Sequence, residues 1–147
     1  MIRATATIVA LVIMLSFPAV ATAALYANVI AVNFNGGTTV DVVVSILKGI
    51  DNAARNGNAD FGVRVTVTYV SQQGTVETLD SGRVSTRDTT FAFSLGSRTV
   101  AIILNIPIGT TPAPGPNPSF SATVQVLHKD PATGTDDALG PPEESFP

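Results

Sequence analysis

The strongest candidate for ion-binding chemistry lies in a loop between residues 51 and 60. Asn56, Asn58 and Asp60 place oxygen-bearing side chains at alternate positions, as calcium-binding loops do. The loop glycine, Gly57, is not where an EF-hand requires it, and no glutamate follows at the twelfth position. Asn and Gly are also common in tight turns. We therefore expect either a structural turn or a weak calcium site made by these three residues, and we predict no other cofactor.

His128 is the one histidine of the chain, and there is no cysteine. A Ser–His–Asp triad needs a serine and an acid that converge on the imidazole, and the Gly-x-Ser-x-Gly turn of many hydrolases is missing from the sequence. The acidic residues near strands and turns show no pattern that marks a pair for glycoside hydrolysis. The sequence therefore predicts a non-enzymatic protein in which His128 is a partly solvated residue at a strand end.

The aromatic side chains are the other groups that could hold a ligand, by stacking on sugar rings. The chain has no Trp, which is the usual large stacking platform. Tyr69, Phe91 and Phe93 are in phase with core residues, which predicts that they pack inside. Tyr26 and Phe61 fall near the ends of expected elements and are freer. A glycan-binding module therefore stays open as an alternative function.

The elements that must position these groups are strands, because apolar and polar residues alternate with period two. Residues 61–69 show the pattern best, with Val63, Val65, Val67 and Tyr69 on one face. β-Branched residues dominate this segment, as a half-buried strand prefers. Turn sequences rich in Gly, Asn and Ser recur about every 8–12 residues. The sequence therefore predicts an all-β, antiparallel β-sandwich of immunoglobulin-like or jelly-roll type with about 7–8 strands.

Two segments, residues 40–47 and 100–106, are apolar on both faces. Strands of this kind are usually central in a sheet and covered on both sides. Beyond the first segment, apolar residues take helical spacing. We expect a strand to about Lys48 and then a short helical turn within a loop to Asp60, with Asn56-Gly57 as the helix stop. A longer helix over residues 41–56 is the alternative.

The N-terminus has the layout of a secretory signal peptide. Arg3 supplies a positive charge, an apolar run covers residues 8–17, and Ala21-Thr22-Ala23 forms an Ala-x-Ala cleavage site. The apolar run is too short to span a bilayer, which takes roughly 20 helical residues. We expect residues 1–23 to be removed and the mature chain to be secreted, on the cell surface or in the periplasm, with no membrane insertion.

We expect the sandwich domain to cover residues 24–130. Within it, the segment from Pro107 to Pro118 is an extended excursion between two strands, because so many prolines cannot join a ladder. The remaining residues, 131–147, are proline-rich and acidic, which predicts a flexible or loosely draped tail.

Charge is sparse, since 13% of the residues are charged and the net charge is −3. No basic cluster is present, which argues against nucleic acid and anionic membrane surfaces as partners. Together with export and the lack of catalytic motifs, this favours a structural or interaction protein, such as a surface, adhesion or fibre-subunit domain. Its partner would be a second copy or another surface protein. A secreted module that binds a glycan or small ligand is the alternative.

The first mature strand gives a hypothesis for assembly. It lies next to the new N-terminus and could pair with the sheet edge of a neighbouring subunit. The alternative is that this strand completes its own sheet. The apolar positions that would make the contact are Tyr26, Val29, Ile30, Val32 and Phe34.

Overall fold

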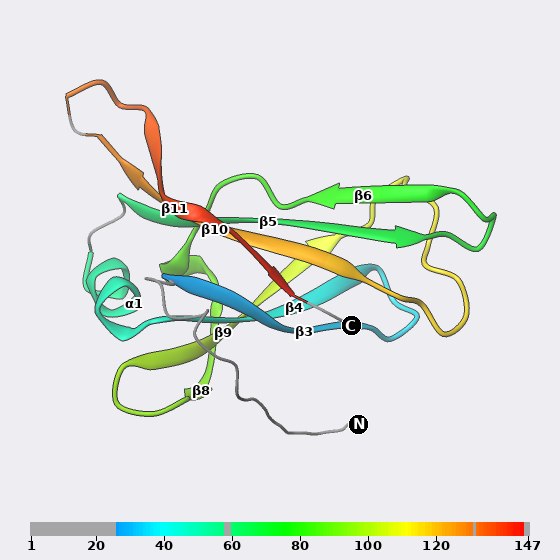
Figure 1. Cartoon of the computed structure of the whole chain (residues 1–147), viewed down its shortest axis with the longest axis horizontal. Coiled ribbons are helices and arrows are strands. Elements are labelled where there is room, and N and C mark those ends of the chain that lie inside the picture. Colours follow the sequence, from blue (N-terminus) through cyan, green and yellow to red (C-terminus); the bar gives the residue numbers. More distant parts are fainter. Residues whose placement is uncertain (1–25, 58–59, 131, 146–147) are drawn as a thin grey trace.

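The computed structural model describes residues 26–57, 60–130 and 132–145. The predicted signal peptide, residues 1–23, lies outside them. Two antiparallel sheets stack face to face and enclose one hydrophobic core (Figure 1). The predicted all-β antiparallel sandwich is therefore confirmed, while the choice between the immunoglobulin-like and jelly-roll types stays a prediction. Within the described ranges, no helix is long and apolar enough to cross a membrane.

The first sheet has the strand order β11-β10-β5-β6, and the short strand β7 also pairs with β5. All of its pairings are antiparallel. Its members are β5 (Phe61–Val70), β6 (Val76–Asp80), β7 (Val84–Ser85), β10 (Ser121–Lys129) and β11 (Asp136–Ser145).

The second sheet has the order β3-β4-β9-β8, so the two doubly apolar segments form its two central strands, as predicted. A 3₁₀ turn, η2 (Thr86–Asp88), leads from the first sheet into β8. The members of this second sheet are β3 (Ala27–Phe34), β4 (Thr39–Leu47), β8 (Thr90–Ser94) and β9 (Thr99–Pro107).

The core forms where the alternating apolar residues of both sheets meet. Successive side chains of a strand point to opposite faces, so one apolar set per strand is enclosed. On β4, Val40, Val42 and Val44 are fully buried, and on β5, Val63 and Val65 are too. Among the described residues, Asp51 is the one fully buried residue that carries a charge at neutral pH.

The segment after β4 forms the helix α1 (Lys48–Arg55), which closes one end of the sandwich. The expected strand up to about Lys48 is confirmed, and the alternative of a helix from residue 41 is wrong because Val42, Val43 and Val44 pair with β9. Gly57 has a φ of +114°, a conformation that glycine adopts readily. Its N–H bonds to the Ala54 carbonyl, so the helix ends at the expected Asn56-Gly57 stop.

The C-terminal segment differs from the tail that its composition predicts, because Asp136–Ser145 forms β11 and pairs with β10. Pro141 and Pro142 lack an N–H, which normally confines proline to edge strands and bulges. β11 is an edge strand, and the ladder is irregular between the pairs Val124↔Glu143 and Val126↔Leu139. The prolines fall in this irregularity, which explains how a proline-rich segment joins a sheet.

The proline-rich excursion after β9 is tied to the end of β5. The Tyr69 hydroxyl donates to the Pro112 carbonyl at 2.7 Å, and the Gln72 N–H donates to the Ala113 carbonyl at 2.9 Å. Tyr69 is buried, as predicted, and packs edge to face on Phe120 with ring centroids 6.0 Å apart. The excursion is thus an ordered cap over the end of the sandwich opposite α1.

The prediction that Phe91 and Phe93 pack inside is wrong, because Phe91 is 47% exposed and Phe93 is 49% exposed. A bulge in β8 is the reason. Phe91 lies opposite Ile102, whereas Phe93 lies opposite the very next residue of β9, Ala101. The extra residue reverses the inside–outside phase, so simple alternation fails along this strand.

Candidate functional site

Two residues of the predicted calcium loop are described, and they have structural roles. Asn56 follows the last helical residue of α1, and its N–H donates to the Asn52 carbonyl at 2.9 Å. The backbone carbonyl of Asp60 accepts from the Lys129 N–H at 2.9 Å and from the Arg83 guanidinium. Asn58 lies outside the described residues. Among the residues described, no three His, Cys, Asp or Glu side chains gather as a metal site. The calcium site stays a prediction.

His128 lies at the end of β10, where the sequence places it. Its ring is tilted against that of Phe61, with centroids 4.7 Å apart. His128 lies directly opposite Phe61 in the ladder between β10 and β5. The imidazole therefore has a packing role at the α1 end of the sandwich.

The predicted assembly strand pairs with β4 of the same chain. Val29 is buried, and Tyr26, Val32 and Phe34 pack against the core. Ile30 is 44% exposed, because it occupies a bulge between the pairs Val29↔Val44 and Ala31↔Val43. The structure thus uses four of the five predicted residues inside their own domain.

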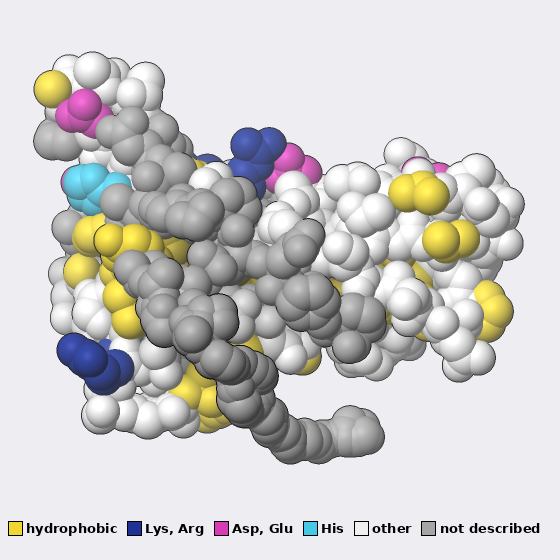
Figure 2. Space-filling model, in the orientation of Figure 1, with side chains coloured by type: hydrophobic (Ala, Val, Ile, Leu, Met, Phe, Trp, Pro, Cys, Tyr) yellow, Lys and Arg dark blue, Asp and Glu magenta, His cyan; other side chains and the backbone are white. Residues whose placement is uncertain are grey.

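The outer face of the first sheet is largely polar, and its exposed apolar residues are Val70 and Val76, which lie opposite each other where β5 and β6 meet their turn. The hydroxyls of Thr66 and Thr123 lie 2.6 Å apart across neighbouring strands. Arg64 on β5 donates to the carboxylate of Asp80 on β6 at 3.0 Å. These hydrogen bonds from Arg64 lower the pKa of Asp80 below its ordinary value. Figure 2 shows a basic and an acidic side chain side by side along this upper side of the molecule.

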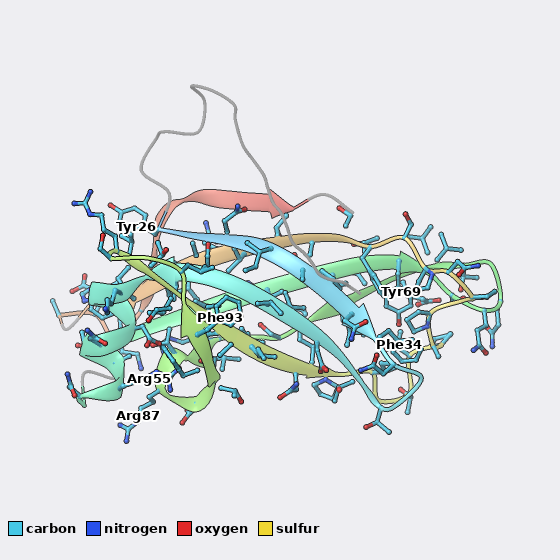
Figure 3. All side chains as sticks on the ribbon, turned by 90° about the horizontal axis from the view of Figure 1, so that it is seen from below. Tyr26, Phe34, Arg55, Tyr69, Arg87 and Phe93 are labelled. Atoms are coloured by element: carbon cyan, nitrogen blue, oxygen red, sulfur yellow. The ribbon has the colours of Figure 1, made fainter. Side chains whose placement is uncertain are left out.

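The outer face of the second sheet is apolar, in contrast. Because Val42, Val44, Ile102 and Leu104 point into the core, their neighbours in the sequence point outward. Figure 3 views the molecule from this side and labels Phe93 on β8. We call this surface the apolar face, and its residues are Ala31 on β3, Val43 on β4, Phe93 and Leu95 on and just after β8, and Ala101 and Ile103 on β9.

The ladder pairings place these residues side by side. Phe93 lies opposite Ala101, and Ile103 lies opposite Val43, which in turn lies opposite Ala31. Ala101 is fully buried although it points outward, while Phe93 and Leu95 remain 49% and 42% exposed. Large apolar residues exposed together on one face mark interaction sites more often than scattered ones do.

Charge is almost missing from this sheet. Asp41 is the one charged residue in the four strands that form it. Its carboxylate accepts from the Asn105 amide at 2.7 Å and from the Thr39 hydroxyl at 3.0 Å. Lys48 and Arg98 flank the opposite end, where the Lys48 N–H donates to the Arg98 carbonyl at 2.8 Å. The apolar face therefore has an acidic end and a basic end.

A buried ion pair positions β8, the strand that carries Phe93. Asp51 of α1 is 1% exposed and binds the Arg55 side chain at 2.9 Å. The same guanidinium donates to the carbonyl and the hydroxyl of Thr89, both at 3.2 Å, and lies 6.0 Å from the centre of the Phe91 ring. Arg55 thus ties the start of β8 to the helix, and sequence reasoning did not single out this pair.

A shallow hollow of about 730 Å³ lies at the α1 end, next to the apolar face. Phe61, Ile50 and Leu47 supply its apolar lining, and Lys48 and Arg98 supply positive charge. Phe61 is one of the two aromatic residues that the sequence left free for a ligand. If the chain is a ligand-binding module, this hollow is the candidate site for the ligand.

Comparison with protein-family models, with curated proteins and with solved structures finds no match to this chain. The fold and its surface therefore define the class of protein: an antiparallel β-sandwich with one largely polar and one apolar outer face.

Proposed function

We propose that the mature chain is an exported, non-enzymatic structural or interaction domain that works through its apolar face. The partner we expect is a protein surface that is itself flat, apolar and almost uncharged. The observation that carries the proposal is the difference between the two outer faces. Threonine hydroxyls and an ion pair lie along the middle of one outer face, and its exposed valines are confined to one end, while Val43, Phe93 and Ile103 lie side by side across the middle of the other.

The sequence supports this reading from a second direction. Strands that are apolar on both sides are normally covered on both sides. β4 and β9 are such strands, and the first sheet covers only their inner side. A protein partner on the outer side would supply the missing cover, as a third layer at the usual spacing of about 10 Å between stacked sheets.

The sheet edges favour contact through a face and disfavour strand addition. β8 pairs with only the first half of β9, so residues 104–107 have no strand partner on that side among the described residues. Pro107 ends this half, and a proline at an edge withholds the N–H that an added strand needs. The bulge at Ile30 disrupts the opposite edge, and Pro141 and Pro142 do the same on β11.

The size of the sheet suits a protein interface. β4 and β9 each have nine residues, a length of about 30 Å at roughly 3.3 Å per residue. Four strands at a spacing of about 4.8 Å are about 19 Å wide. A partner that covers this area would bury on the order of 1,100 Å² in total, near the lower end of specific interfaces.

The experiment compares the mature protein, from residue 24, with its Phe93→Ser/Leu95→Ser variant. We expect weaker retention on a phenyl matrix and, wherever the wild type associates, a lower mass by light scattering. Val76→Ser is the matched control, because Val76 is 70% exposed on β6 of the other sheet. If the double variant matches the wild type in both retention and mass, the proposal falls.

The second candidate function is a secreted ligand-binding module, and the hollow beside Phe61, Lys48 and Arg98 favours it. Its cationic and aromatic lining suits an acidic sugar or another small anion. Thermal melting with acidic and neutral glycans, and with calcium, tests it, because a bound ligand stabilises the fold by RT ln(1 + [L]/Kd). A melting temperature that rises with one of these ligands, and does so less in Phe61→Ala, would support this function.

A further inference from the structure

We infer that the partner of the apolar face is a second copy of this chain, and that the two copies run antiparallel. This inference rests on the proposed function. In this dimer, β4 of one copy lies over β4 of the other and runs in the opposite direction. Asp41 of each copy then faces the end of the other copy that carries Lys48 and Arg98.

The partner follows from the chemistry of the face. A covering surface must be flat, apolar and nearly uncharged, and the apolar face itself has these properties. Two copies that meet through Val43, Phe93 and Ile103 bury no charge in the middle of the contact. The same patch used by both subunits is the arrangement of two-fold dimers, the commonest symmetric assembly.

The orientation follows from the positions of the charges. Asp41 lies opposite Asn105 at one end of the ladder, and Lys48 and Arg98 meet beyond Leu47↔Thr99 at the other end. The six residue-to-residue steps from Asp41 to Leu47 span about 20 Å at roughly 3.3 Å each. One face therefore has separated charges of opposite sign along the strand direction.

Two in-plane symmetry axes can bring the faces together, and the charges distinguish them. An axis along the strands places Asp41 against the acidic end of the other copy and brings both basic ends together. An axis across the strands reverses the strand direction, so that each acidic end meets a basic end. Like charges facing each other disfavour a complex and opposite charges fix its register, which selects the second axis.

Neighbouring groups on the face are compatible with this pairing. Oδ1 of Asp41 accepts from both Thr39 and Asn105 within the chain, and the residue is still partly exposed to a partner. Arg98 is exposed, and neither Lys48 nor Arg98 forms an ion pair with any residue described. The two edge strands, β3 and β8, contain no ionisable side chain, and the nearest charges before β8 are Arg87 and Asp88 of η2, which have opposite signs.

The experiment measures the dimer dissociation constant of the mature protein by sedimentation equilibrium at low salt. Asp41→Lys alone, and Lys48→Glu/Arg98→Glu alone, are each expected to raise the constant about tenfold or more, because each places like charges together. The triple variant restores opposite charges and is expected to regain most of the affinity. Added salt should weaken the wild-type dimer, because it screens these exposed charges.

A second measurement does not depend on these substitutions. The chain has no cysteine, so Ser45→Cys introduces a single thiol near the middle of the outer face. In the antiparallel dimer this thiol lies near its symmetry mate and is cross-linked by a short bis-maleimide. Asn33→Cys lies at the acidic end on β3, and its thiol is far from its symmetry mate and escapes cross-linking.

The outcomes separate this inference from the proposed function. The antiparallel arrangement is overturned if Phe93→Ser weakens the dimer but the charge reversals leave its dissociation constant unchanged. Cross-linking through Asn33→Cys would overturn it as well. A chain that stays monomeric at all concentrations, while its Phe93-dependent retention on phenyl matrix persists, overturns the second copy as partner and leaves the proposed function standing. Loss of both effects overturns both proposals.

Discussion

Phe91 and Phe93 lie two positions apart on β8, yet they lie opposite adjacent residues of β9, Ile102 and Ala101. Ile102 points into the core and Ala101 points outward, so the two phenylalanines take opposite sides of the sheet. One ring stays beside Arg55 at the sheet edge, and the other joins the apolar face. A single bulge thus places Phe91 where its ring contacts Arg55 and Phe93 on the outer, apolar face of the sheet.

The two phenylalanines therefore make a matched pair of variants. Phe93→Ser is expected to change the free energy of unfolding of the monomer by less than about 1 kcal/mol, as for most surface positions. It should reduce retention and association. Phe91→Ser removes the ring beside Arg55, a contact of about 0.5–1 kcal/mol, and should leave association unchanged. Urea unfolding and light scattering on both variants check this, and equal loss of association in the two would contradict the assignment of sides.

The buried pair of Asp51 and Arg55 should be the most sensitive polar contact. Arg55→Met leaves the Asp51 carboxylate buried without its partner and detaches Thr89, which we expect to cost about 2–3 kcal/mol of unfolding free energy. The double variant Asp51→Asn/Arg55→Met should cost less than the sum of its single changes. Denaturant unfolding measures the cycle. Additive single effects would mean that the two side chains act independently.

The exposed pair of Arg64 and Asp80 provides the control for that cycle. It lies on the polar face, where solvent weakens ion pairs. Arg64→Met is therefore expected to change stability far less than Arg55→Met. Because Arg64 lowers the pKa of Asp80, the small contribution of this pair is present above the ordinary aspartate pKa and is lost as the pH falls.

The hydroxyl of Tyr69 should hold the proline-rich excursion in place. Tyr69→Phe removes the hydrogen bond to the Pro112 carbonyl, and we expect a loss of about 1–2 kcal/mol. Tyr26→Phe is the control, because it removes the hydroxyl of a tyrosine that lies just before β3. Thermal or denaturant unfolding gives the comparison, and an equal effect in both variants would show that the hydrogen bond adds nothing.

The same tyrosine predicts how stability depends on alkaline pH. Burial and the nearby Glu77 raise the pKa of Tyr69 above its ordinary value of 10.0. The unfolded chain then releases this proton at a lower pH than the folded chain does. The stabilisation is fully present below the ordinary tyrosine pKa and is lost as the pH rises through the folded pKa. Between about pH 8 and 11, the free energy of unfolding should fall more steeply with pH for the wild type than for Tyr69→Phe.

Removal of the C-terminal strand should destabilise the fold, whereas the composition of this segment alone predicts a flexible tail whose removal has no effect. β11 pairs with β10 along most of its length, so removing residues 136–147 uncovers the backbone groups of β10. We expect the shortened chain to melt at a lower temperature and to aggregate more, because an uncovered edge accepts other strands. Hydrogen exchange should show slowed amides between residues 136 and 145. Fast hydrogen exchange of these amides, together with an unchanged melting temperature after truncation, would support the flexible tail that the composition predicts.

The sequence by itself determined the secondary structure of most of the chain. Alternation with period two predicts β5, and double-sided apolar runs predict that β4 and β9 are central. Side-chain direction in a strand depends only on local backbone geometry, so these features can be read locally. The helix stop at Asn56-Gly57 is equally local. Each of these features needs only the nearest neighbours in the chain.

Tertiary structure alone decided which surfaces stay uncovered. The bulge between Phe91 and Phe93 depends on how β8 meets β9, and a shift of one residue turns a side chain to the other face. The pairing of β11 depends on an edge that β10 offers, and the link from Arg55 to Thr89 joins residues 34 positions apart. The sequence predicted that β4 and β9 are covered on both sides, but only the packed structure shows that the first sheet covers one of these sides.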